Sequence, residues 1–454
     1  MPKLILPQAL LSLFAAFAPC CTQPGFEYFV AFLLNFMAGT GRRTAASAYA
    51  RSNLSRHWTN AVRWLSRNRA DQRRPSMAQR LLKLLLSRLP LPRDSKGRRR
   101  LYIPVDETRV QKSKAAAKMD HLHYWYNPQG GACRGRYIWG HLWALVGVLL
   151  PIGSNGRLRC FPITAGLCPP KDKAQKSKND TSYTARTFFR LLEGLNWPAD
   201  CIRTLIGDGA FACKPLLDWC REQGFFLISH VQLNADVREV LPPPPSTKRT
   251  RGRPRKWGDR IDLREVYHDD SRFQPLPEPL YEQGVEGSYA SLIGVLKRSG
   301  DKVRIVLVKT EKYKPFALIC TDLSLDPLEI LYIFTDRVEI EITIRELKDE
   351  TGFGDYQVRR QHAIERHGQI SIVACALLKL LRTRPQVLGA GGEIAAQTLP
   401  WKRARDSFST NQVRTLLQQA CIAELIFRVL AIARANVENR RAVAALRSLG
   451  FGMC

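Results

Sequence analysis

A single acid lies between two cations, at helical spacing, in the segment YIFTDRVEIEITIRELK. At 3.6 residues per turn, one face of such a helix would carry Phe334, Arg337, Glu341 and Lys348. Glu339 lies only two residues from Glu341 and therefore points away from that face. A carboxylate held between positive groups suits a metal ligand that works beside a phosphate backbone. A solvated helix with ordinary ion pairs is the alternative interpretation.

Two aspartates upstream each end an apolar run of strand length. Asp106 ends LYIPVD, and Asp208 ends TLIGD, between two glycines. Because strand ends present side chains at the edge of a sheet, folding could bring both aspartates close to Glu341. Three converging carboxylates repel one another unless cations neutralise them, and such oxygen ligands suit Mg²⁺ or Mn²⁺. Taken alone, an aspartate beside a strand is more often a turn or cap residue.

Together these residues resemble the DDE transposases of prokaryotic insertion sequences, specifically the group with a Y-x2-R-x3-E-x6-K helix. The resemblance runs in order over roughly residues 10 to 385 and includes the segment GFGDYQVRRQHAIERHGQISIVACALL. It implies that the catalytic, metal-binding triad of an RNase H-like fold is formed by Asp106, Asp208 and Glu341. It also implies that Arg337 and Lys348 contact DNA phosphates. The signature tyrosine is Phe334 here, which keeps the ring but lacks the hydroxyl donor.

The resemblance further implies an enzyme that cleaves and transfers DNA strands at transposon ends. Two Mg²⁺ or Mn²⁺ ions per active site are expected, with Asp106 as the bridging ligand. The expected partners are double-stranded DNA, at the transposon ends and the target, and a second copy of the chain when DNA is bound. A DNA-binding protein without catalysis, or a nuclease that cuts without joining, are the alternatives that the sequence leaves open.

The overall charge agrees with a polyanionic partner. The 454 residues include 70 basic and 40 acidic side chains, a formal net charge of +30. Nucleic acid is favoured over a membrane surface because no amphipathic basic helix dominates, and binding should depend strongly on salt. The twelve cysteines form no pair of C-x2-C motifs, which argues against zinc and for reduced thiols. We expect a cytoplasmic, nucleoid-associated protein, in which the short apolar run 142–152 is a core strand.

The order of the patterns predicts an α/β protein with an RNase H-like mixed sheet flanked by helices. Residues 97–235, the first part of the catalytic core, read as three strands followed by helix, strand, helix and strand. Residues 326–385, the second part, carry the glutamate helix. A basic linker and β-rich insertion, 236–325, separates the two parts, and helical regions occupy residues 1–96 and 386–454. The first of these is expected to bind DNA.

The best local candidate for reading DNA is the segment SRHWTNAVRWLSRNR. One face of a helix over residues 57–67 would be apolar and would include Trp58 and Leu65. The opposite face would be basic, with Arg56, Arg63 and Arg67. Preceded by GTGRRTAASAYA, the segment resembles a helix-turn-helix whose second helix enters the major groove. A basic surface helix of a bundle is the alternative.

A second basic segment follows four consecutive prolines. The residues Arg251-Gly-Arg253-Pro resemble the core of an AT-hook, a short arm that lies in the minor groove of A·T-rich DNA. A phosphate-binding loop without sequence preference explains the same residues equally well. In either case the arm is expected to contact DNA.

Overall fold

The computed structural model divides the chain into two compact units. One unit comprises Met1–Leu85, Gln111–Leu122 and Arg345–Cys454, and the other comprises Leu86–Val110 and His123–Ile344. The residues that the structure describes are 4, 6–7, 10–54, 57–67, 74–116, 118–127, 136–152, 156–170, 183–241, 256–280, 284–383 and 408–435.

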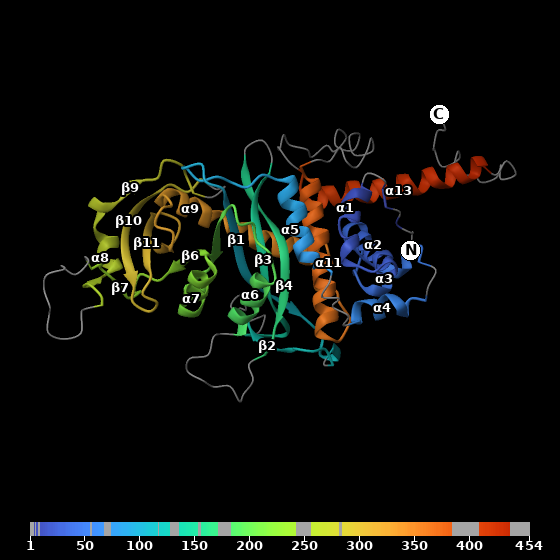
Figure 1. The fold of residues 1–454 in the computed structure, drawn as a ribbon, viewed down its shortest axis with the longest axis horizontal. Helices are drawn as coiled ribbons and strands as arrows, with labels where there is room; N and C mark the ends of the chain where they lie inside the picture. Colours follow the sequence, from blue (N-terminus) through green and yellow to red (C-terminus); the bar gives the residue numbers. More distant parts are fainter. Residues whose placement is uncertain are drawn as a thin grey trace. The chain divides into compact units, whose positions relative to one another are not determined.

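The second unit is built on one mixed sheet (Figure 1). Its strands are β1 (Arg100–Gln111), β2 (His123–Tyr126), β3 (Tyr137–Ile152), β4 (Arg157–Cys168), β5 (Ile202–Gly207), β6 (Phe226–Val231), β7 (Val237–Arg238), β8 (Arg260–Ile261), β9 (Gln274–Pro275), β10 (Gly287–Leu296), β11 (Lys302–Thr310) and β12 (Phe316–Cys320). Along the sheet the order is β2-β3-β1-β5-β6-β12-β11-β10-β7-β8, while β4 pairs with β3 and β9 with β10.

The core of this sheet has the topology predicted from the sequence. β3 and β4 form a long antiparallel pair, whereas β1, β5 and β6 run parallel to one another. Helices α6 (Tyr183–Glu193) and α7 (Lys214–Gln223) follow β4 and β5. The resulting order β4-β3-β1-β5-β6, with helices between the later strands, is that expected of an RNase H-like fold. The predicted fold class is therefore confirmed.

The β-rich segment after β6 continues this sheet. β12 pairs with β6 in antiparallel fashion, and β11 and β10 follow outwards. The short helix α8 (Leu263–His268) lies in the same segment. The segment predicted as an insertion between the last core strand and the glutamate helix thus adds strands to the same sheet, because its backbone groups pair along the open edge of β6.

The run 142–152 is a core strand, as predicted. It belongs to β3, and nearly all of its side chains are buried. Both faces of a strand that is covered on both sides must be apolar, which explains its continuous hydrophobic run. Within the part of the chain that the structure describes, no helix is long and apolar enough to cross a membrane.

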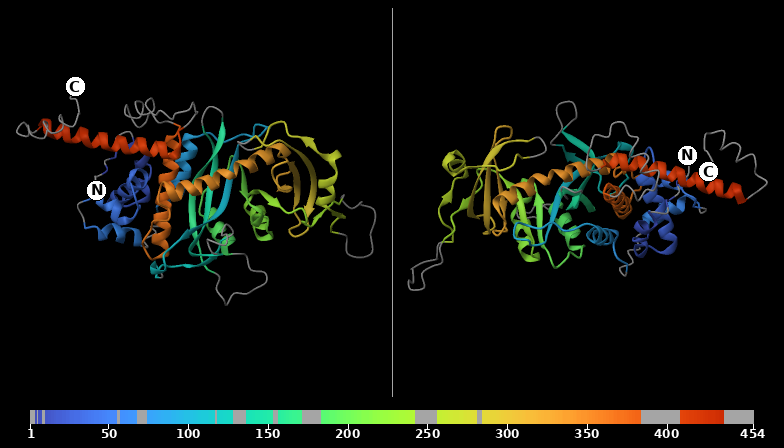
Figure 2. Two further views of the ribbon diagram at one scale, coloured as in Figure 1. Left: turned by 180° about the vertical axis from the view of Figure 1, so that it is seen from behind. Right: turned by 90° about the horizontal axis from the view of Figure 1, so that it is seen from above.

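The predicted glutamate helix is two helices. α9 (Pro327–Asp336) begins at Asp326, which forms a capping box with Glu329, and α10 (Val338–Asp349) follows after Arg337. Around the break, the amide of Ile340 donates to the carbonyl of Arg337, three residues back. This tightening at Arg337 corrects the expectation of one uninterrupted helix. Figures 1 and 2 show α6 and α7 on one face of the sheet and α9 with α10 on the other.

The first unit is helical. Its helices are α1 (Leu11–Ala15), α2 (Gln23–Ala38), α3 (Ala45–Ala50), α4 (Thr59–Ser66), α5 (Met77–Arg88, which ends just beyond the unit), α11 (Gln361–Leu381) and α13 (Thr410–Ala435). Single 3₁₀ turns are η2 (Ala18–Cys20), η3 (Lys114–Ala116), η4 (Gly209–Phe211) and η5 (Asp270–Arg272), of which the last two belong to the sheet unit. α11 is buried along most of its length and packs against α2, α4 and α13.

Candidate active site

Two aspartates lie level with each other on neighbouring strands of the sheet. β1 and β5 pair in parallel, with Pro104 opposite Ile206. Continuing this register by two residues sets Asp106 opposite Asp208, which immediately follows β5 in extended backbone. Neighbouring strands lie about 4.8 Å apart, and residues two apart share a face. The register therefore directs both carboxylates toward the same face of the sheet.

The surroundings of the two aspartates differ. The sequence predicted that Asp106 ends its strand. This is wrong, since β1 continues through Gln111. Asp208 caps the turn η4, and its Oδ1 accepts a hydrogen bond of 2.9 Å from the amide of Ala210. The carbonyl of Asp208 accepts a further bond of 2.6 Å from the hydroxyl of Ser229 on β6. These bonds hold the backbone of Asp208 beside β6.

Arg337, at the junction of α9 and α10, contacts two of the predicted catalytic residues. Its Nη1 lies 3.6 Å from Oδ2 of Asp106, and its Nη2 lies 3.1 Å from Oε1 of Glu341. The Arg337 side chain is only 14% exposed, whereas that of Glu341 is 54% exposed. The ring centroid of Phe334 lies 5.9 Å from the guanidinium carbon. The α9–α10 junction thus places one cation between the sheet and the exposed glutamate.

Electrostatics couple the three carboxylates. Burial raises the pKa of Asp106 to about 6, Arg337 and the Glu107 amide lower it, and the charges of Asp208 and Glu341 raise it further. This is the behaviour of an acid that is poorly hydrated and shares its site with like charges. Shifts of this kind concentrate at functional sites, although structural ion pairs also produce them.

Two further titratable residues border the site and were not identified from the sequence. His230, on β6, has its pKa lowered by burial, partly offset by the charge of Asp208. Glu107, next to Asp106 on β1, has its pKa raised by burial, while a hydrogen bond from Thr184 lowers it. No local pattern marks either residue: Glu107 is noticed because it follows Asp106 on β1, and His230 because the charge of Asp208 acts on it.

Glu339 is separated from Glu341 in the way its spacing predicted. Its side chain is buried and pairs with Arg159 of β4. Burial raises the pKa of the neighbouring Asp336 to about 7, the charge of Glu339 raises it further, and Arg157 and Arg159 lower it. Asp336, the last residue of α9, and Glu339, in the first turn of α10, thus lie near basic residues of β4.

The carboxylates fit a divalent metal ion in donor chemistry. Three acidic side chains supply the hard oxygen donors that Mg²⁺ and Mn²⁺ prefer. Among the described residues, however, no three His, Cys, Asp or Glu side chains are grouped closely enough to hold an ion together. The Arg337 guanidinium is the positive charge that now lies between Asp106 and Glu341. In donor chemistry the three carboxylates therefore fit a divalent metal ion, and the charge of Arg337 balances two of them in this structure.

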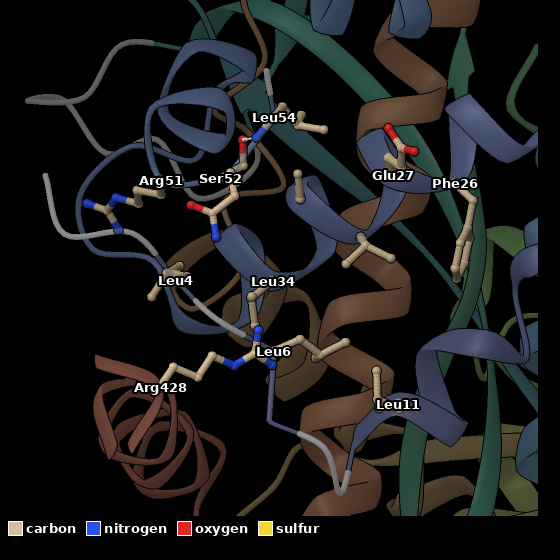
Figure 3. Close-up of a pocket in the computed structure, with 13 residues that line it drawn as sticks. Leu4, Leu6, Leu11, Phe26, Glu27, Leu34, Arg51, Ser52, Leu54 and Arg428 are labelled. Atoms are coloured by element: carbon tan, nitrogen blue, oxygen red, sulfur yellow. Dashed lines mark hydrogen bonds between the residues drawn. The ribbon is translucent and has the colours of Figure 1, made fainter. Parts of the chain in front are cut away.

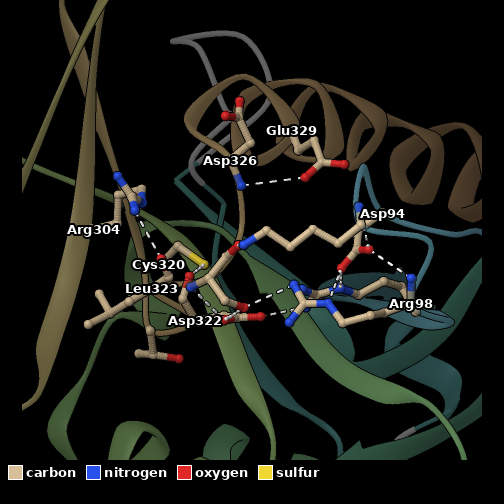
Figure 4. A network of polar contacts seen from close by, with 12 residues as sticks. Asp94, Arg98, Arg304, Cys320, Asp322, Leu323, Asp326 and Glu329 are labelled. Atoms are coloured by element: carbon tan, nitrogen blue, oxygen red, sulfur yellow. Dashed lines mark hydrogen bonds and ion pairs between the residues drawn. The ribbon is translucent and has the colours of Figure 1, made fainter.

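A buried ion-pair network lies between β1 and the segment that precedes α9 (Figure 4). Arg100, in β1, donates from Nε to Asp94 at 2.9 Å and from Nη1 to Asp322 at 2.6 Å. The side chains of Arg100 and Asp94 are fully buried, and Arg98 pairs with the same carboxylate at its solvent side. Asp322 lies four residues before the N-cap of α9. The network thus joins the strand that carries Asp106 to the segment that leads into α9 and Arg337.

The remaining predicted DNA contacts lie on separate elements. Lys348 is exposed on α10, seven residues after Glu341. Arg63 lies on α4 and Arg67 directly after it, and both are exposed. Outside the described residues lie Arg56, Arg251 and Arg253.

The helix predicted to read DNA buries different side chains from those expected. α4 begins at Thr59, and Trp58, assigned to the apolar stripe, is 46% exposed. Trp64 instead packs against the rings of Tyr28 and Phe32. These ring contacts join α4 to α2, and they could not be read from the spacing of α4 alone. α3 and α4 do form the expected pair of consecutive helices.

A cavity of about 600 Å³ lies in the helical unit (Figure 3). Its wall is mostly apolar, with leucines at positions 4, 6, 11 and 34 and the polar side chains of Glu27 and Arg51. None of the candidate catalytic carboxylates lines it. The cavity is therefore separate from the candidate active site.

Comparison with protein families supports the assignment drawn from the sequence. Residues 173–378 match the family described as transposase DDE domain. The match contains Asp208, Arg337 and Glu341, while Asp106 precedes it. No curated protein matches the chain. The family match confirms the resemblance to insertion-sequence DDE transposases, and with it a transposase-type, nucleotidyl-transfer function that implies binding to DNA.

Proposed function

We propose that this chain is an insertion-sequence DDE transposase that cleaves and transfers DNA strands at transposon ends, with Asp106, Asp208 and Glu341 as its catalytic residues. One observation carries the proposal: Asp106 is level with Asp208 across paired strands and shares Arg337 with Glu341. Residues far apart in the sequence are thus linked by strand pairing and through Arg337, and the charges of both Asp208 and Glu341 act on Asp106.

The family generally uses divalent metal ions, and the donor set fits Mg²⁺ or Mn²⁺. Asp106, Asp208 and Glu341 would hold two such ions, with Asp106 as the residue common to both. Bound in this way, the ions would activate the attacking water or 3′-hydroxyl and stabilise the departing oxygen of an in-line phosphoryl displacement.

The other side chains would bind and orient the DNA. Arg337 carries a planar fork of donors that matches a phosphate as well as a carboxylate, so it could release a carboxylate and bind a DNA phosphate. Lys348 would contact the backbone further along α10. Arg63, Arg67 and the arm with Arg251 and Arg253 would add affinity through phosphates, which position a protein without specifying sequence. We propose that two copies of the chain act together on the DNA.

The experiment that tests the catalytic assignment is the substitution Glu341→Gln. It keeps the size and hydrogen-bonding capacity of the side chain but removes the charge that a metal ligand needs. Binding to a duplex containing the transposon end should stay close to that of the parent, while Mg²⁺-dependent nicking should fall at least ~100-fold. Asp349→Asn, an exposed carboxylate on the same helix, is the matched control and should cleave normally.

Each alternative function has its own outcome. Equal nicking by Glu341→Gln and the parent would refute the catalytic assignment. DNA binding by the parent without any cleavage would favour a non-catalytic DNA-binding protein. Cleavage without joined products, in an assay that supplies a target duplex, would favour a nuclease.

A further inference from the structure

The hairpin formed by β2 and β3 carries aromatic rings on one face. In its antiparallel register, Tyr124 is opposite Trp139 and Tyr126 is opposite Tyr137. Residues directly opposite and two apart share a face, so these four rings lie together on one side of the hairpin. The amide of Asn127 donates to the carbonyl of Arg136 at 2.9 Å and extends the pairing toward the loop.

The rings pair with one another yet remain open to solvent. The centroids of Tyr124 and Trp139 lie 4.8 Å apart, and those of Tyr126 and Tyr137 lie 6.0 Å apart. Tyr124, Tyr126 and Tyr137 are nevertheless 51%, 59% and 61% exposed. Large exposed aromatic surface of this kind marks an interaction site more often than it marks packing. Trp125, on the other face, bonds back to the carbonyl of Gly140 and is half-buried.

The sequence of the hairpin and its flanks favours a nucleic acid as the occupant of this aromatic face. From His121 through Lys171 the sequence contains no Asp or Glu, while Arg136 precedes Tyr137 directly and is exposed. An acidic protein surface would satisfy the charge but offers few flat rings, whereas an unpaired nucleotide offers both a phosphate and a flat base. Stacked bases inside a duplex are hidden from such rings, so the matching ligand is single-stranded.

We propose that Tyr124, Tyr126, Tyr137 and Trp139 form a stacking platform for unpaired bases of DNA. The rings stack on the faces of one or two bases, and Arg136 contacts the adjoining phosphate. Recognition through ring faces tolerates any base, so the platform binds single strands without sequence preference. The proposal rests on the proposed function only in taking DNA as the partner, and it assigns a binding site away from the carboxylates.

The test compares two double variants at the most exposed rings. Tyr126→Ala with Tyr137→Ala removes the stacking surface, whereas Tyr126→Phe with Tyr137→Phe keeps it and removes only the hydroxyls. Binding to a fluorescent single strand of about 12 nucleotides, of mixed sequence and in EDTA, should weaken at least ~10-fold in the alanine variant. The phenylalanine variant should bind like the parent. The salt dependence should be the same in all three proteins, because it reports phosphate contacts.

Duplex DNA and oligomeric state supply the controls. Affinity for the duplex of the same sequence should be unaffected by either variant. Equal single-strand binding by the alanine and phenylalanine variants would overturn the proposal, as would an equal loss on the duplex. A change in sedimentation without a change in single-strand binding would show that a second copy covers the face instead. If the double alanine variant does not fold, Tyr137→Ala alone decides by the same comparison with Tyr137→Phe.

The outcomes also separate this inference from the catalytic assignment. Loss of single-strand binding in the alanine variant would support the platform even if the parent fails to cleave. Normal single-strand binding by that variant would reject the platform while leaving the catalytic proposal intact.

Discussion

The guanidinium of Arg337 lies within 3.6 Å of the carboxylate of Asp106, with Nη1 nearest to Oδ2. Nη1 has no hydrogen-bond partner among the described residues, although it is buried. Nη2 of the same group donates to Glu341. The charges of two proposed metal ligands therefore hold Arg337 between them, and its Nη1 can still donate a hydrogen bond to another partner. A metal ion that binds both carboxylates must compete with this cation.

Removing that cation should strengthen metal binding in the absence of DNA. In Arg337→Gln, Asp106 and Glu341 lose their internal counter-charge, and the affinity for Mn²⁺ should rise about 10-fold because a nearby cation no longer repels the ion. Mn²⁺ titration followed by electron paramagnetic resonance measures it. Arg345→Gln, which removes an exposed cation from α10, controls for the general loss of charge and should have a smaller effect. Unchanged or weaker Mn²⁺ binding by Arg337→Gln would show that the Arg337 guanidinium and the metal ion do not compete.

Metal binding should also depend on pH through Asp106. The pKa of this carboxyl is raised to about 6, mainly by burial, so the group is protonated below that pH and ionised above it. Protons and metal ions compete for the same oxygens, and Mn²⁺ affinity should therefore fall as the pH is lowered from 7.5 to 5. The loss from this group is at most about tenfold per pH unit. Asp106→Asn should bind Mn²⁺ weakly at every pH, and a pH dependence equal to the parent's in that variant would assign the effect to another group.

The buried network beneath α9 should contribute strongly to stability. Arg100→Ala leaves the buried carboxylates of Asp94 and Asp322 without their shared partner, which should lower the free energy of unfolding by about 3–5 kcal/mol. Arg98→Ala removes a more exposed contact with Asp94 and should cost less than ~1 kcal/mol. Urea unfolding of both variants measures the difference. Equal losses would mean that burial of Arg100 adds nothing to the ion pair.

Substitutions of Glu339 and of Glu341 should differ in their effect on stability. Glu339→Gln breaks a buried ion pair with Arg159 and should destabilise the protein by ~1–3 kcal/mol, while Glu341 is mostly exposed and its substitution should leave the melting temperature nearly unchanged. Thermal unfolding of the two variants, measured side by side, checks this. A larger loss of stability for Glu341→Gln would indicate that Glu341 has a structural role.

The order of strands and helices in the core could be predicted because it depends on local patterns. Continuous apolar runs such as 142–152 can be stable only where both faces of a strand are covered, and the runs of the β1, β5 and β6 regions behave in the same way. The charge and the ordered motifs likewise indicated DNA and the transposase family without any knowledge of contacts. The positions of Asp106, Asp208 and Glu341 as candidates came from the same local signals.

Relationships that depend on pairing between distant segments were decided only by the tertiary structure. The sequence shows that Asp106 and Asp208 each follow an apolar run, but only the register of β1 with β5 sets them level. Spacing alone predicted one helix across Arg337, whereas the folded chain tightens there and turns its guanidinium toward β1. His230 became part of the site for the same reason. Periodicity along a chain reports which face of an element is buried, and the partner that buries it is chosen by long-range packing that no local pattern records.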